Sequence, residues 1–115
     1  MKKGIIRKLS CAIALIMAFV SMAGMALAEG EKYDIGIIQL VQHPALDQAT
    51  EGFKAALTEK LGAENVNFDY QNAQGDSSTC ATIVNGFVSS GVDLILANAT
   101  AALQAAYTGT ATIPI

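Results

Sequence analysis

The chain has 115 residues, seven basic and ten acidic side chains and a formal net charge of −3, and this length allows one domain at most. Residues 29–115 keep only three lysines against all ten acids, a formal charge of −7, and contain no arginine. This balance argues against a nucleic-acid partner, because phosphates are usually met by clustered Lys and Arg. Cys80 is the one cysteine after residue 28, so an internal disulfide is excluded there.

The first 28 residues have the pattern of an export signal. A basic start is followed by an apolar stretch over residues 11–27, which closes on the small residues of Ala26-Leu27-Ala28. We therefore predict a secretory signal peptide at 1–28 and a protein exported across the cytoplasmic membrane, periplasmic or at the cell surface. An uncleaved anchor is disfavoured because Ser21 and Gly24 interrupt the stretch, and a membrane span usually needs about 20 apolar residues.

The first half of the remaining chain predicts strand, helix, strand. Residues 34–41 form a nearly continuous apolar run, typical of a strand that is covered on both faces. Residues 46–61 have helical spacing, and Gly62 is placed to end that helix. Residues 66–70 alternate between apolar and polar side chains, which indicates a strand with one wet face at a sheet edge. The apolar face of the helix is expected to consist of Leu46, Ala49, Phe53, Leu57 and Leu61.

The second half of the chain predicts helix, strand, helix and the start of a last strand. Residues 77–90 predict a helix that Asp76 caps and Gly91 ends, with Cys80 as a small buried hydrophobe on its apolar side. Residues 92–97 predict a strand, and residues 101–107 predict a helix for which Thr100 can serve as the cap. Residues 113–115 begin a last apolar segment. Phe53, Phe68 and Phe87 are expected in the core.

This order of elements calls for an α/β fold with a doubly wound parallel sheet. The first and third strands read as doubly buried and the second as an edge, which favours the strand order 2-1-3-4. Because the fourth strand is cut at its third residue, we expect residues 29–115 to be part of a larger α/β lobe.

The candidate site follows from this topology, because ligands bind such sheets beyond the carboxyl ends of the strands, where the strand order reverses. Three loops meet there, and each leads into a helix whose first N–H groups are free. Thr100 could hold a ligand carboxylate or only cap its helix; His43 could donate to a ligand or only anchor the turn with Pro44. Asn72 and Gln74 could contact ligand or hold their loop. The full set of candidate ligand-binding residues is Thr100, Asn72, Gln74, His43, Gln42, Asn98 and Ala99.

The same loops resemble one family of ABC-transporter substrate-binding proteins, the tryptophan- or aromatic-amino-acid-binding-like group. The resemblance rests on His43-Pro44-Ala45-Leu46-Asp47, on Asn72-Ala73-Gln74-Gly75-Asp76, and on residues 92–95 followed by Ala99-Thr100. It implies the N-terminal lobe of a type I periplasmic binding protein, here without its hinge and second lobe. It further implies a small polar ligand, an amino acid as the best guess, and an ABC permease in the membrane as partner. We expect a monomer with no cofactor.

Two other classes compete with this interpretation. The same fold serves as a ligand-binding sensor that feeds a membrane receptor or kinase, and the sequence leaves that alternative open. An enzyme is disfavoured because the chain has no phosphate-binding glycine motif and no nucleophile with an adjacent base. A metal site is disfavoured too, since His43 is the single histidine and has no second ligand at a suitable spacing.

Overall fold

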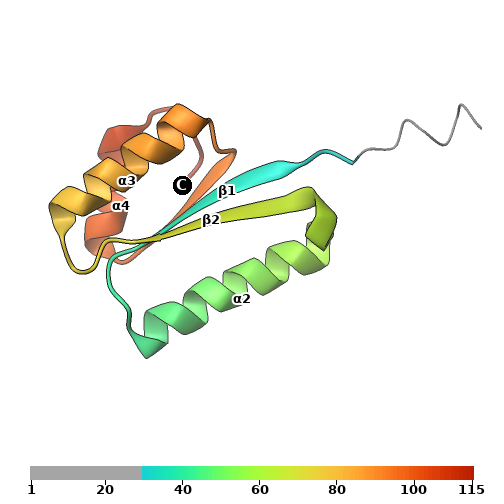
Figure 1. Ribbon diagram of the computed structural model, residues 1–115, viewed down its shortest axis with the longest axis horizontal. Coiled ribbons are helices and arrows are strands. Elements are labelled where there is room, and N and C mark those ends of the chain that lie inside the picture. The colour runs from blue at the N-terminus through green and yellow to red at the C-terminus, as the bar shows by residue number, and fades with distance from the viewer. Residues whose placement is uncertain (1–29) are drawn as a thin grey trace, which may run out of the picture. The chain divides into compact units, whose positions relative to one another are not determined.

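The computed structural model describes residues 30–115, and the signal peptide predicted for residues 1–28 lies outside them. Strands and helices alternate along the described chain, as the sequence predicts (Figure 1). In chain order the elements are β1 (Tyr33–Gln39), α2 (Pro44–Leu61), the 3-10 turn η1 (Ala63–Asn65), β2 (Val66–Asn72), α3 (Ser77–Ser90), β3 (Leu94–Asn98) and α4 (Thr100–Gly109). Within this part of the chain, no helix combines the length and apolar character needed to cross a membrane.

The three strands form one parallel sheet in the order β2-β1-β3, which confirms the predicted fold class and the edge position of β2. β1 pairs with β2 from Tyr33, opposite Val66, to Gln39, opposite Asn72. It also pairs with β3, and there Gln39 lies opposite Asn98. All three strands therefore end level with Gln39, and the loops that follow them start from one edge.

The described residues hold three of the four predicted strands, because residues 110–115 form bends and irregular backbone rather than a strand. The backbone N–H of Ile95, in β3, nevertheless donates to the carbonyl of Pro114 at 2.9 Å. This bond places the end of the chain beside β3, where the order 2-1-3-4 puts the fourth strand.

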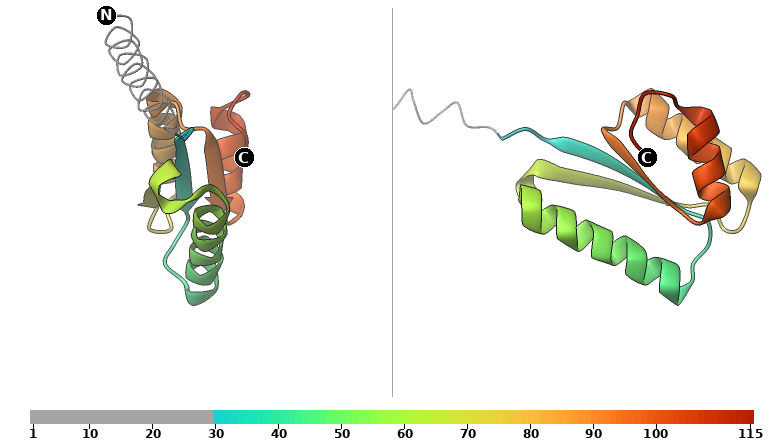
Figure 2. Two further views of the ribbon diagram at one scale, coloured as in Figure 1. Left: turned by 90° about the vertical axis from the view of Figure 1, so that its right-hand side faces the viewer. Right: turned by 180° about the vertical axis from the view of Figure 1, so that it is seen from behind.

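The helices lie on both faces of the sheet, with α2 on one face and α3 and α4 together on the other (Figures 1 and 2). Right-handed crossovers require this arrangement when the chain steps from β1 outward to β2 and then back past β1 to β3. The main core lies on the α3 and α4 side. It is made of Ile38, Ala73, Cys80, Val84, Phe87, Val92, Ile95, Ala102 and Ala106.

Phe87 determines how closely α3 approaches the sheet. Its ring packs against β1 at Gly36, where an added Cβ would lie 2.8 Å from two of the ring carbons. Phe87 is buried, as predicted, but Phe53 and Phe68 are only partly buried. The expectation that all three lie in the core is therefore wrong for two of them. α2 alone covers their face of the sheet within the described residues, and one helix leaves part of that face open.

α2 differs from its prediction at its start and on its buried face. It begins at Pro44 rather than at residue 46, and a proline suits the first turn because its missing N–H would have no helical partner there. Ala49, expected on the apolar face, is exposed, and the next residue, Thr50, is buried instead. The helix thus turns a hydroxyl toward the sheet close to the carboxyl ends of the strands.

Candidate ligand-binding site

The three loops that follow the strands meet at the carboxyl edge of the sheet, as the sequence predicts. The N–H of Leu40 donates to the carbonyl of Asn98 at 3.2 Å, and the N–H of Ala73 donates to the carbonyl of Gln39 at 2.9 Å. The N–H of Gly75 donates to the carbonyl of Leu40 at 2.7 Å. The first loop thus binds the other two through its own backbone.

The first loop carries Gln42 and His43, and both are exposed. His43 is the N-cap of α2, and its Nδ1 accepts a hydrogen bond from the N–H of Ala45 at 3.2 Å. The capping alternative for His43 is therefore present in the structure. With Nδ1 as acceptor, a neutral imidazole carries its proton on Nε2, and this second nitrogen can donate to a ligand.

The second loop is held by its own side chains. The Oδ1 of Asn72 accepts from the N–H of Gln74 at 2.7 Å, and its Nδ2 lies 3.5 Å from the hydroxyl of Tyr70. Gln74 has a φ of 55°, and its side chain is exposed. The oxygen of Asn72 is therefore engaged in shaping the loop, whereas the Gln74 amide points outward from a left-handed turn.

Asp76 closes this loop by capping α3, as predicted. Its carboxylate accepts from the N–H of Ser78 at 2.8 Å, and also from the hydroxyls of Ser78 and Thr79. The hydrogen bonds from Ser78, followed by those from Thr79, lower the pKa of Asp76 below its usual value. The Asp76 carboxylate is thus committed to the helix rather than to a ligand.

The third loop corrects one prediction. Thr100 does not cap α4; it is the first residue of that helix, and the N-cap is Ala99, which offers no side-chain hydrogen bond. Ala99 has φ 91° and ψ 159°, a conformation that glycine adopts readily and other residues rarely do. The first N–H groups of α4 consequently have no partner within the helix and no side-chain cap, and Thr100 is exposed beside them.

Asn98 is committed to the scaffold rather than to the open face. Its Nδ2 donates to the carbonyl of Leu46 at 2.9 Å and to the hydroxyl of Thr50 at 3.0 Å. Gln39 and Thr50, which the sequence interpretation passed over, belong to the same group of contacts. A signal for Gln39 was present, because a glutamine inside a doubly buried apolar run has to find hydrogen-bond partners there.

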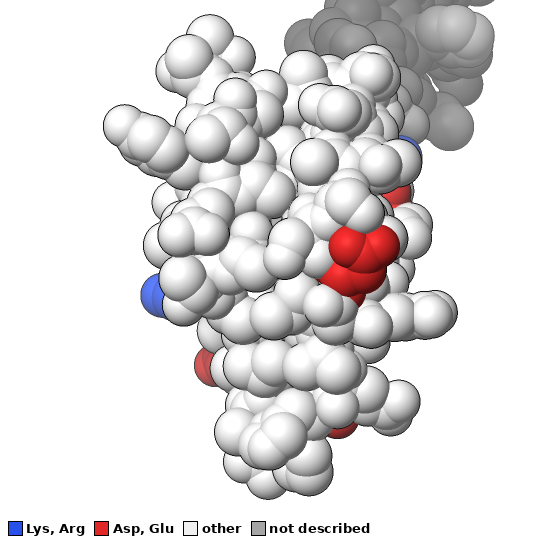
Figure 3. Space-filling view, turned by 90° about the vertical axis from the view of Figure 1, so that its left-hand side faces the viewer, with Lys and Arg blue, Asp and Glu red and all other residues white. Residues whose placement is uncertain are grey.

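The face at this edge carries few charged side chains (Figure 3). In the sequence, Asp93 is the single charged residue after Asp76, and residues 29–115 contain no arginine. A negatively charged ligand group would therefore be met here by backbone N–H groups and neutral side chains. The helices that begin at this face favour a negatively charged group near their N-termini through their dipoles.

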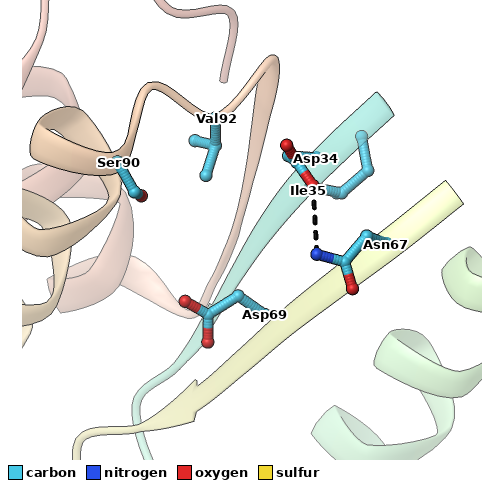
Figure 4. A pocket seen from close by; sticks show the side chains of 6 residues that line it. All are labelled: Asp34, Ile35, Asn67, Asp69, Ser90 and Val92. Atoms are coloured by element: carbon cyan, nitrogen blue, oxygen red, sulfur yellow. Dashed lines mark hydrogen bonds between the residues drawn. The ribbon is translucent and has the colours of Figure 1, made fainter. Parts of the chain in front are cut away.

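Two cavities of the described surface lie away from this edge. One cavity of about 210 Å³ is lined by Asp34, Ile35, Asn67, Asp69, Ser90 and Val92, where the Nδ2 of Asn67 donates to Asp34 at 3.0 Å (Figure 4). A second, of about 250 Å³, lies between β2 and α3. Neither of these two cavities is lined by a predicted site residue. Among residues 30–115 no three His, Cys, Asp or Glu side chains come together to hold a metal ion.

Comparisons with known proteins agree with this fold. The family described as ABC transporter substrate binding protein matches residues 34–115, so the chain belongs to that family. Its relatives are binding proteins, in agreement with the expectation that it is not an enzyme.

Individual relatives narrow the comparison. The chain is 49% identical over 84 residues to a tyrosine-binding protein of Clostridioides difficile, covering 71% of this chain and 24% of that protein. It resembles the ligand-free, open structure of a substrate-binding protein with adhesive properties from Clostridium difficile, with TM-score 0.68, 45% identity and coverage of 71% and 28%. It also resembles a Streptococcus pneumoniae ABC domain in complex with L-Trp, with TM-score 0.69, 34% identity and coverage of 73% and 29%. The chain thus spans about a quarter of the length of these relatives.

Proposed function

We propose that residues 29–115 form part of the first lobe of an extracytoplasmic receptor that binds an aromatic amino acid and delivers it to an ABC permease. The signal peptide predicted at 1–28 supports the location. The names of two relatives, one a tyrosine-binding protein and one solved with L-Trp, support the ligand class. Since the chain spans about a quarter of these relatives, we further propose that a second lobe completes the cleft.

The uncapped first turn of α4 is the observation that carries this proposal. α2 and α3 each receive a side-chain cap, from His43 and Asp76, but the N-terminus of α4 receives none. A ligand carboxylate placed there would accept from the free N–H groups and from the hydroxyl of Thr100. Gln42, His43 and Gln74, all exposed at the same edge, are proposed to contact the polar groups of the ligand.

The aromatic part of the ligand would then lie against an uncharged surface. Tyr70, two residues before the end of β2, is 41% exposed, and Val41, in the first loop, is 39% exposed. In this proposal the ligand ring packs between such side chains and the second lobe, and hinge closure over the ligand produces the form that docks on the permease.

A thermal-shift screen of the two-lobe protein tests the proposal. L-Tyr and L-Trp should raise the melting temperature, because a ligand that binds only the folded state stabilises it by mass action. Tyramine and tryptamine, which keep the ring and lose the carboxylate, should raise it far less. A rise with sugars or nucleosides and none with aromatic amino acids would refute the proposed ligand class. An equal rise with tyramine and L-Tyr would refute the carboxylate contact at α4.

A further inference from the structure

A cluster of buried and partly buried polar side chains lies beneath the candidate site. We call Gln39, Asp47, Thr50 and Asn98 the polar cluster. Gln39 is 0% exposed and Thr50 is 2% exposed, and they are the buried polar residues of the described chain. Burying an amide and a hydroxyl destabilises a fold unless both are hydrogen-bonded, so such a cluster needs a complete set of partners.

The side chain of Gln39 is the centre of the polar cluster. Its Nε2 donates to Asp47 Oδ1 at 2.6 Å and to the carbonyl of Val41 at 2.9 Å. Its Oε1 accepts from the Thr50 hydroxyl at 2.8 Å and lies 3.5 Å from Asn98 Nδ2. Among the described residues, no buried side-chain nitrogen or oxygen lacks a partner. The cluster therefore joins the end of β1, the first two turns of α2 and the end of β3.

The same few residues also reach every loop of the site. Val41 lies in the first loop, and its carbonyl is held by Gln39 Nε2. The backbone of Gln39 and Leu40 binds the second loop at Ala73 and Gly75. Asn98 immediately precedes the strained Ala99 and, through Leu46, ties the third loop to α2. Removing a side chain of the polar cluster would therefore move the loops even though that side chain does not touch a ligand.

We propose that the polar cluster is a positioning unit. It fixes the three loops relative to one another and so influences ligand affinity without contacting the ligand. This inference rests on the proposed function for its binding readout. A binding site loses affinity when its contact groups drift by more than about 0.5 Å, which gives the supporting residues their influence. Thr50 is the most informative member, since valine has its shape without the hydroxyl.

The test compares Thr50→Val with Thr50→Ser in the two-lobe protein. The valine variant removes the hydrogen bonds to Gln39 and Asn98, and the serine variant keeps the hydroxyl that makes them. Thr58→Val is the matched control, because Thr58 is partly buried two turns further along the same helix, toward the other end of the sheet. Affinity for L-Trp and L-Tyr is measured by calorimetry well below every melting temperature.

We expect Thr50→Val to weaken binding by roughly three- to tenfold, about the worth of one hydrogen bond. Thr50→Ser and Thr58→Val should bind within about twofold of the parent protein, a change well inside the effect of one hydrogen bond. Unchanged affinity in Thr50→Val, or an equal loss in Thr58→Val, would overturn the proposal. A core residue with no positioning role would lower the melting temperature and leave the affinity as it was.

Amide hydrogen exchange of the ligand-free protein decides the matter independently of the ligand. Thr50→Val should speed exchange by roughly tenfold at the hydrogen-bonded amides of the first and third loop segments, which are Leu40, Asp47 and Leu103. The amides of Ile37 and Ile38 should exchange as in the parent protein. If the parent protein binds no aromatic amino acid, the proposed function fails, and this exchange pattern still tests the positioning unit. Unchanged exchange in both loop segments would overturn it.

A second pair of variants covers the case in which Thr50→Val does not fold. Asp47 is only partly buried, and its Oδ1 accepts from Gln39. Asp47→Asn keeps an acceptor oxygen, whereas Asp47→Ala removes it. The alanine variant should show the faster loop exchange and the weaker binding, and the asparagine variant should restore most of both. Identical behaviour of the two Asp47 variants would count against the positioning unit.

Discussion

Replacing Ala99 with glycine should stabilise the protein, although the substitution deletes a methyl group. Ala99 holds φ 91° and ψ 159°, where an L side chain clashes with its own backbone. Such a conformation costs about 1–3 kcal/mol in a residue other than glycine. Glycine loses more conformational entropy on folding, which costs about 0.5–1 kcal/mol. The difference predicts that the free energy of unfolding rises in Ala99→Gly, by up to about 2.5 kcal/mol.

Urea unfolding followed by circular dichroism measures this difference. The midpoint should move to higher urea while the slope stays constant, because only the folded state loses strain. Ala101→Gly is the matched control: the same substitution lies two residues later, inside the first turn of α4. There glycine should destabilise by about 0.5–1 kcal/mol. If Ala99→Gly destabilises as much as Ala101→Gly, the strain argument is refuted.

Three further predictions concern other parts of the lobe. Gly36→Ala should destabilise by about 1–3 kcal/mol, seen as a lower urea midpoint, because its Cβ would overlap the buried ring of Phe87. Asp76→Asn should make the melting temperature fall less steeply in acid. The folded-state pKa of Asp76 lies below the usual 3.8, so its contribution to stability is complete above pH 3.8 and disappears as the pH falls through the folded-state pKa. Melting curves of the parent protein and of Asp76→Asn from pH 6 to 2 measure this difference. Thr100→Ala should leave stability within about 0.5 kcal/mol, since its hydroxyl caps nothing, yet weaken aromatic amino-acid binding severalfold in calorimetry; unchanged affinity would remove Thr100 from the site.

The elements with periodic or punctuated sequences were predictable because their signals are local. α3 begins after Asp76 and ends before Gly91, as predicted. A carboxylate cap and a left-handed glycine depend on the neighbouring backbone alone. The edge position of β2 followed from its alternating pattern. α2 begins at Pro44, two residues before its predicted start. The prediction missed this start because histidine is a rarer N-cap than serine or aspartate.

The meeting of the three loops at one edge was predictable, but the contacts of their side chains were not. Topology brings the three loops to one edge, and this needs only the order of strands and helices. Whether Asn98 faces a ligand or the scaffold depends on Thr50, which is 48 residues away in sequence. The strain at Ala99 was equally hidden, since alanine carries no signal for a left-handed backbone. Contacts over such separations are set by packing, which a single sequence does not reveal.

Because the three strands end in one row, the exposed residues of the loops are separate from the residues that support those loops. Gln39, Asn72 and Asn98 share one row of the sheet, and the side chains of Gln39 and Asn98 belong to the polar cluster. Gln42, Gln74 and Thr100 stand above it with exposed side chains. Under the proposed function, a combinatorial library confined to those three outer positions would change the ligand preference of the two-lobe protein while the hydrogen bonds of the polar cluster stay in place.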